Sequence, residues 1–202
     1  MKIGRWLLCL AVFVCMDAWA QGPTGIGSLQ LGLTPEQVTA LPESGVHLAA
    51  PLGPYQSPGG RPVELKPGEE RFDTKIQTPW SDGPLKATLT FNGGTLTSMY
   101  VNLDDSEALV KTVAAQIEEK FGAPQVTDSR TVERCPSYAG GTEEVRSGSL
   151  YNIWNQDKGN KVVRTNVGTY VLDGCLGRRY NERRKVLASI SVFPVEASKN
   201  PF

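Results

Sequence analysis

The strongest constraint on the fold is one long amphipathic helix that lies between segments of strand periodicity. Through residues 105–121 the apolar side chains recur every four positions, at Leu109, Val113, Ile117 and Phe121. This spacing places them in one stripe along a helix, which must be buried against another element. Asp104 or Asp105 is the expected N-terminal cap, and Gly122 with Pro124 just beyond it marks the expected C-terminal end.

The segments on both sides of this helix alternate apolar and polar residues. Before it, 85–91 alternates, Asn92-Gly93-Gly94-Thr95 supplies a turn, and a return strand places Met99, Val101 and Leu103 on one face. Further strands are expected at 72–78 (weak), 125–131, 149–156, 161–167, 169–173 and 185–193, with a hairpin turn at 157–160. Few local patterns demand parallel pairing, so the sequence predicts an α+β fold with a mainly antiparallel sheet.

A second, shorter helix is expected directly after Thr34. Thr34 can cap it, Gln37 completes a capping box, and Pro42 ends it near Leu41. Two helices would thus pack on the sheet. Glycine and proline cluster at 42–84 and 136–148, where we expect long irregular connections. Residues 21–194 would form one domain, and 195–202 a loose tail.

The first twenty residues have the pattern of a cleavable export signal. Lys2 and Arg5 precede an uncharged apolar run, and Ala18 and Ala20 stand before Gln21 as in a cleavage site. A retained membrane anchor is the poorer alternative, because a spanning helix needs about twenty apolar residues. Lipidation is not expected, since Cys9 and Cys15 lie inside the apolar run without preceding small residues. We expect cleavage after Ala20 and a periplasmic or secreted protein with no membrane span.

Only Cys135 and Cys175 remain once this signal is removed. In an oxidising compartment an isolated pair predicts a disulfide. It would close a loop of roughly forty residues, for which the chain-entropy model gives about 4 kcal/mol at most. A redox pair or a metal site is the alternative, but the chain has no C-x-x-C motif and one histidine, His47. We therefore expect no metal and no cofactor, and a β-rich C-terminal half linked by the disulfide.

Charge and motifs argue against several functions. The balance of 21 basic and 21 acidic residues loses two bases and one acid with the signal, which leaves 19 against 20. Such a neutral chain is not drawn to nucleic acid. His47 stands in a loop-like region, and no hydrolase or nucleotide motif is present. The adjacent acids Asp104-Asp105, Glu118-Glu119 and Glu143-Glu144 are interpreted as capping or solvated residues, so no catalytic residue is assigned.

The candidate binding residues form a basic cluster near the C-terminus. They are Arg178, Arg179, Tyr180, Arg183, Arg184 and Lys185. Arginine forks suit carboxylates and phosphates, so an anionic partner is predicted: a protein surface or another anionic component of the envelope. The alternative is an ordinary charged hairpin tip that keeps a sheet edge soluble. Tyr151 and Trp154 fall on opposite faces of a strand, so one of them should point outward.

Two short motifs resemble a known family. Leu31-Gly32-Leu33-Thr34-Pro35-Glu36-Gln37-Val38 and Lys120-Phe121-Gly122-Ala123-Pro124 are similar to helix boundaries of small proteobacterial envelope domains. The best-known relatives are the small lipoprotein subunit of the outer-membrane β-barrel assembly machinery and periplasmic domains shaped like it. The resemblance implies helices on one face of an antiparallel sheet and no catalytic site. It transfers no functional residues, because the two motifs contain none.

The function that these observations favour is a non-catalytic, exported binding or interaction protein. An inhibitor or immunity protein against an enzyme that acts in the periplasm is one subtype. The alternatives are a cell-envelope hydrolase, whose acids the fold would bring together, and an accessory subunit of an envelope assembly. The sequence indicates neither the partner's identity nor the oligomeric state.

Overall fold

The structure is a computed structural model that describes residues 23–53, 55–56, 62–136, 140–159, 161–175 and 185–196. The expected export signal at 1–20 lies outside the described residues. So do five of the six predicted binding residues: Arg178, Arg179, Tyr180, Arg183 and Arg184.

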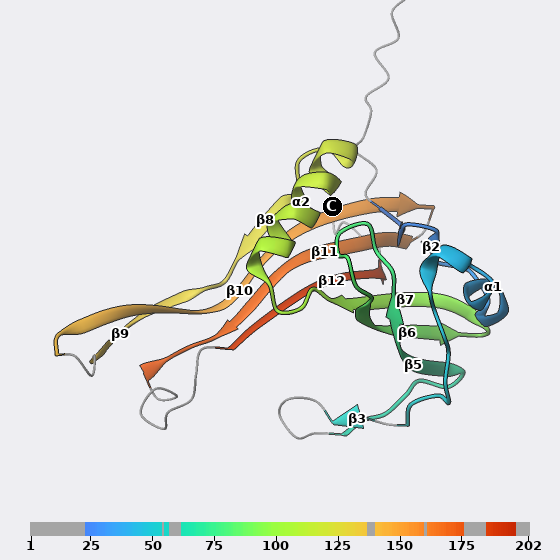
Figure 1. Ribbon diagram of the computed structural model, residues 1–202, viewed down its shortest axis with the longest axis horizontal. Coiled ribbons are helices and arrows are strands. Elements are labelled where there is room, and N and C mark those ends of the chain that lie inside the picture. The colour runs from blue at the N-terminus through green and yellow to red at the C-terminus, as the bar shows by residue number, and fades with distance from the viewer. Residues whose placement is uncertain are drawn as a thin grey trace, which may run out of the picture.

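Strands make up most of the described chain (Figure 1). The first half contains β1 (Gly25–Ile26), β2 (Leu29–Gln30), α1 (Pro35–Thr39), the 3-10 turn η1 (Pro42–Ser44), β3 (Tyr55–Gln56), β4 (Pro62–Val63), β5 (Glu69–Ile76), β6 (Leu85–Asn92) and β7 (Thr95–Asn102). The second half contains α2 (Glu107–Phe121), β8 (Gln125–Asp128), β9 (Thr131–Pro136), β10 (Thr142–Lys158), β11 (Lys161–Leu172) and β12 (Lys185–Glu196).

One large sheet organises the molecule. Its strands lie in the order β5-β6-β7-β12-β11-β10-β8, and β9 pairs with the outer end of β10. The pairings between its described strands are antiparallel. The predicted α+β class, with a mainly antiparallel sheet and two helices, is therefore confirmed. The turn at Gly93 and Gly94 is confirmed as well, with φ values of 58° and 75° that favour glycine.

Several strands are longer than the sequence predicted, whereas the strand predicted at 125–131 is shorter and ends at Asp128. The prediction of an irregular connection over 136–148 is wrong, because β10 begins at Thr142 and its first six residues pair with β9. The two strands predicted on either side of Gly168 are one strand, β11, in which Gly168 pairs with Tyr151. Cross-strand pairing on both sides of a strand overrides the weak local propensity of glycine. β12 also continues two residues beyond Pro194.

The long connection expected over 42–84 is more ordered than predicted. β5 spans Glu69–Ile76 and pairs with β6 along its whole length, so it is a full strand of the sheet. Leu52 forms an isolated antiparallel bridge with Arg71 on the outer side of β5. The proline and glycine content of this region therefore shapes the turns around β5 and leaves the strand intact.

Helix α2 begins at Glu107, two residues later than expected. Ser106, not Asp104 or Asp105, is the N-terminal cap, because its hydroxyl accepts the backbone N–H of Leu109 at 3.2 Å. Asp104 and Asp105 adopt positive φ values of 52° and 53° and form the turn that leads into the cap. The C-terminal end at Phe121 and Gly122 is as predicted. The capping box of α1 is also confirmed, with Thr34 and Gln37 in both reciprocal bonds.

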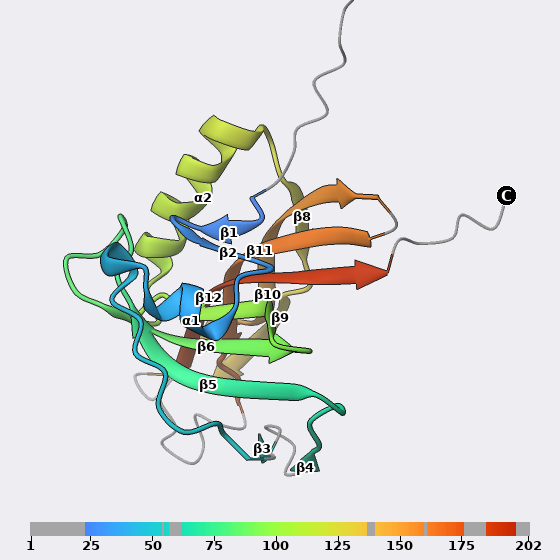
Figure 2. The same ribbon diagram turned by 90° about the vertical axis from the view of Figure 1, so that its right-hand side faces the viewer.

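Among the described residues, the hydrophobic core lies on one face of the sheet. The helices α1 and α2 and the β1–β2 hairpin all lie on this side (Figure 2). Their buried residues, among them Leu29, Val38 and Val113, belong to one core cluster with Leu89, Val101 and Ile190 of the sheet. The buried Thr165 hydroxyl donates to the carbonyl of Pro23 at 2.8 Å and fixes the start of the described chain on this face. The opposite face of the sheet is called the uncovered face below.

One end of the sheet projects away from this core. We call residues 131–136, 142–147 and 171–175 the arm, and the rest of the sheet with its two helices the body (Figure 1). At the junction, Gly148 has a φ of 115°, and a Cβ there would lie 2.7 Å from the carbonyl oxygen of Ser129. This glycine allows β10 to pass from its pairing with β8 to its pairing with β9.

No helix within the described ranges is long and apolar enough to cross a membrane.

Candidate interaction surface

The uncovered face is built from every second residue of the strands. The register aligns these residues in rows across the sheet. One row contains Thr88, Tyr100, Ser191, Asn166 and Ile153. The next contains Asn102, Ser189, Gly168 and Tyr151, and the row after it contains Leu187, Tyr170 and Ser149. The face therefore combines tyrosines with small and amide side chains.

Three of these residues, Tyr100, Tyr151 and Tyr170, form what we call the tyrosine cluster. Tyr100 and Tyr170 are 42% and 41% exposed, which is high for large hydrophobic side chains, whereas Tyr151 is partly buried. Room for the Tyr151 ring comes from Gly168, where an added Cβ would lie 2.5 Å from a ring carbon. Gly168 thus sets the position of Tyr151 through a close approach that any side chain would prevent.

Its surroundings affect the phenol group of Tyr151. Burial raises the pKa of the Tyr151 phenol above its ordinary value of 10.0, and the neighbouring Tyr100 and Tyr170 raise it further. At neutral pH the Tyr151 hydroxyl is therefore protonated and can donate a hydrogen bond. The cluster offers apolar ring area together with hydroxyl groups that can bond to a partner.

The composition of this face is typical of a protein-binding surface. Tyrosine provides a large rigid contact area at small entropic cost, and serine, asparagine and glycine provide adaptable hydrogen bonding, as in antibody paratopes. The centre of the face carries no charged residue in the rows of Ser191 and Ser189 between β7 and β10. Aromatic enrichment with few charges is also the pattern of the centre of protein interfaces.

A shallow basin of about 800 Å³ lies where the uncovered face meets β5. Lys75, Lys86, Thr88, Tyr100 and Asn102 all line it. The basin is therefore continuous with the tyrosine cluster, because Tyr100 belongs to both. Two of its polar groups, those of Lys75 and Lys86, are positively charged, and the hydroxyl and amide groups can both donate and accept hydrogen bonds.

His47 also lines this basin, together with Asp73. The hydrolase alternative calls for a deep pocket that contains two acids or His47, and this basin contains His47 with one acid among its described lining residues. However, His47 is bonded only through its backbone, to the Thr74 hydroxyl, and Asp73 accepts the Thr88 hydroxyl at 2.7 Å. The imidazole has no carboxylate partner among the described residues, so the orienting group of a catalytic dyad is not in place.

The sequence predictions for this surface are met in part. Trp154 is the inward residue, 3% exposed, and its indole N–H donates to the Gly122 carbonyl at 2.8 Å. Tyr151 is the outward residue, as expected from their opposite faces. Lys185, the one described member of the predicted basic cluster, is exposed at the start of β12 and pairs with Leu172. Tyr100 was not singled out, although the predicted inward face of Met99 and Val101 implies that Tyr100 points outward.

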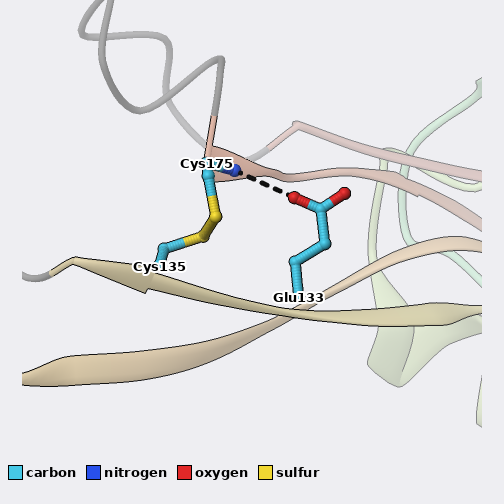
Figure 3. Close-up of side chains that lie close together, drawn as sticks. All are labelled: Glu133, Cys135 and Cys175. Carbon is cyan, nitrogen blue, oxygen red and sulfur yellow. Dashed lines mark hydrogen bonds between the residues drawn. A yellow bond between two sulfur atoms is a disulfide. The ribbon is translucent and has the colours of Figure 1, made fainter.

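The predicted disulfide is present in the arm. Cys135 on β9 and Cys175 after β11 are bonded with a Cα–Cα distance of 5.1 Å (Figure 3). Glu133 lies beside them, and its carboxylate accepts the backbone N–H of Cys175 at 3.3 Å. The ligand atoms of these three residues lie within 4.8 Å of one another. Because both sulfurs are bonded to each other, they supply no thiolate, and this cluster cannot act as a metal site while oxidised.

A second hollow lies between α2 and the sheet on the covered side. It has a volume of about 610 Å³, and its floor includes Val110, Ala114 and Val171. Charges of both signs surround it, including Lys111, Glu118 and Arg146. This groove has neither the aromatic residues nor the uniform charge that would indicate a ligand.

Comparisons with protein-family models, with curated proteins and with solved structures give no match to this chain.

Proposed function

We propose that this chain is an exported, non-catalytic binding protein that holds a protein partner on the uncovered face of its sheet. The observation that carries the proposal is the tyrosine cluster, in which two tyrosines remain more than 40% exposed on a face rich in serine and asparagine. Exposed aromatic residues on a rigid sheet are effective anchors, because little conformational entropy is lost when they are buried.

The periplasm is the compartment that we propose. The Cys135–Cys175 disulfide supports an oxidising environment, and the first twenty residues have the pattern of a cleavable signal. Mass spectrometry of the protein from a periplasmic fraction should find an N-terminus at Gln21. A mature protein that retains Met1 in the cytoplasmic fraction would contradict this part of the proposal.

Site-specific photo-crosslinking tests the binding face. A crosslinking amino acid at position 170, on the uncovered face, should trap a partner protein in the periplasm. The same amino acid at position 132 is the matched control, because Val132 is 52% exposed on the arm and outside the tyrosine cluster. Tyr100→Ala/Tyr170→Ala should then lower affinity for the trapped partner by at least about tenfold. Equal trapping at both positions, or unchanged affinity in the variant, would reject the uncovered face as the binding surface.

Inhibitors and immunity proteins are one subtype of such a binding protein. An inhibitor should lower the activity of the trapped partner if that partner is an enzyme. Loss of this effect in Tyr100→Ala/Tyr170→Ala would link it to the uncovered face. A trapped partner without enzymatic activity would instead favour an accessory role in an envelope assembly.

A further inference from the structure

Two lysines on the uncovered face stand directly opposite each other. Lys75 of β5 and Lys86 of β6 are paired in the register, and both are exposed. Like charges at directly opposed positions destabilise a sheet. Within the described residues, neither ammonium group forms an ion pair or a hydrogen bond. No ion pair among the described residues therefore offsets the repulsion between the two lysines.

The surroundings of the two lysines favour an acceptor with negative charge. Tyr100 lines the same basin and adds a hydroxyl group, whereas the amide group of Asn102 there donates to the Asp105 carboxylate at 3.3 Å. Asp73 is the one acid among the described residues that line the basin, and its carboxylate is engaged by the Thr88 hydroxyl at 2.7 Å. A carboxylate placed between the two lysines would meet two cations and neutral donors.

A second pair of opposed lysines lies outside the basin. Lys158 and Lys161 face each other across the tip of the β10–β11 hairpin. Lys161, however, is also opposite Glu196 of β12, so an acid from the chain itself lies next to this pair. The register places no acid opposite Lys86 on β5, where its partner is Lys75. The pair at the hairpin tip therefore serves as a matched control.

We propose that the basin receives an acidic segment of the protein partner, with a carboxylate bridging Lys75 and Lys86. Apolar side chains of the same segment would lie on the tyrosine cluster, since Tyr100 lines the basin and belongs to the cluster. This inference rests on the proposed function and adds the chemistry of the partner. Opposite charges around an apolar centre give both orientation and a faster association rate.

A peptide titration followed by NMR tests the proposal on the whole mature chain. The probe is a synthetic peptide in which three glutamates alternate with leucines, and the control probe has glutamine in place of glutamate. The acidic peptide should shift backbone amides of Lys75, Lys86, Tyr100 and Asn102. Lys75→Gln/Lys86→Gln should weaken its binding at least about fivefold, whereas Lys158→Gln/Lys161→Gln should change it less than about twofold.

Stability provides an independent check on the variants. Lys75→Gln/Lys86→Gln removes a repulsion, so its denaturation midpoint should equal or exceed that of the wild type. A loss of binding in this variant can then be assigned to the lost charges. If the glutamine peptide binds as well as the acidic one, or if both double variants lose affinity equally, the proposal is overturned.

The outcomes separate this inference from the proposed function. One outcome is that Tyr100→Ala/Tyr170→Ala loses the trapped partner while Lys75→Gln/Lys86→Gln keeps full affinity. In that case the inference of an acidic segment is wrong, and the proposal of the uncovered face as the binding surface is retained. If the tyrosine variant keeps the partner, the proposal of the uncovered face as the binding surface is wrong.

Binding of phosphatidylglycerol vesicles through Lys75 and Lys86 without peptide binding would assign the basin to a lipid surface and overturn the proposal. Self-association lost in the lysine variant would assign it to a second copy and overturn it equally.

Discussion

The body of this molecule buries many large side chains, whereas the arm buries very few. In the body, Leu85, Leu89 and Phe91 of β6 are each 0% exposed beneath the layer that contains α2. Among the described residues of the arm, the buried ones are Cys135, Val145 and Val171. Apolar burial stabilises by about 25 cal/mol per Å², so the arm gains little from it. The disulfide therefore stabilises the arm, whereas the packed hydrophobic core stabilises the body.

This difference shows how one sheet can be longer than its hydrophobic core. β10 has 17 residues, and its first six pair with β9 in the arm. A two-stranded ribbon is marginally stable in water by itself. The Cys135–Cys175 bond links this β9–β10 ribbon covalently to the segment that follows β11. Four variants test this interpretation.

Phe91→Ala should have the largest effect, because it removes a fully buried ring from the body. The ring also packs edge-to-face on Phe72, with centroids 5.7 Å apart. We expect a loss of about 3–5 kcal/mol in the free energy of unfolding, measured by urea denaturation. Val132→Ala, on the exposed surface of the arm, should change it by less than about 0.5 kcal/mol. Similar losses for both variants would show that arm and body are not stabilised differently.

Removal of the disulfide should affect the arm first. Cys135→Ala/Cys175→Ala should lower the free energy of unfolding by up to about 4 kcal/mol, because the unfolded chain regains the entropy of an open loop. Hydrogen exchange should show early loss of protection in β9 and in Thr142–Ser147, while β6 keeps its slow exchange until global unfolding. Protection in the arm that stays equal to that in the body would contradict the assigned role of the disulfide.

Gly148→Ala should disturb the junction between the two regions. The residue needs a φ of 115°, and its new Cβ would meet the Ser129 carbonyl at 2.7 Å. We expect a loss of about 1–3 kcal/mol, from backbone strain together with the clash. Gly159→Ala is the control, because Gly159 also has a positive φ but open space around its Cβ position. Equal effects of the two substitutions would mean that the close approach at Gly148 does not matter.

The smallest effect is a pH dependence at the same junction. Hydrogen bonds from the Arg130 side chain and backbone lower the pKa of Asp128 from 3.8 to about 2. A carboxyl group with a lowered pKa stabilises the fold above its ordinary pKa, and this contribution is lost as the pH falls from about 4 to about 2. Asp128→Asn should therefore be less stable than the wild type at neutral pH and equal to it near pH 2. Because Asp128 is solvent-exposed, the difference should be small and sensitive to salt.

The denaturation midpoint of both proteins between about pH 6 and pH 2 measures this effect. A difference that persists unchanged at the lowest pH would show that the charge of Asp128 is not its cause. The outcome also bears on the arm, because Asp128 ends β8 and Arg130 lies in the connection that leads to β9.

Local patterns in the sequence determined much of the body. The four-residue repeat of α2, the capping box at Thr34 and the glycine turn of β6–β7 all depend on contacts within a few residues. The disulfide was predictable for a different reason, since only two cysteines follow the apolar run of the first twenty residues. Alternation of apolar residues fixed which side of β6 faces inward. It therefore also fixed which side of the neighbouring strands remains outward.

Only the tertiary structure decided where the outward residues meet. Tyr100, Tyr151 and Tyr170 lie on three different strands, and their assembly depends on the strand order β7-β12-β11-β10 and on the register. The Lys75–Lys86 pair depends in the same way on the register of β5 with β6. Antiparallel pairing between distant segments is set by how the whole sheet buries its covered face, and no short pattern encodes it. The sequence by itself therefore determined the helices, the faces of the strands and the disulfide, and the fold determined the surface.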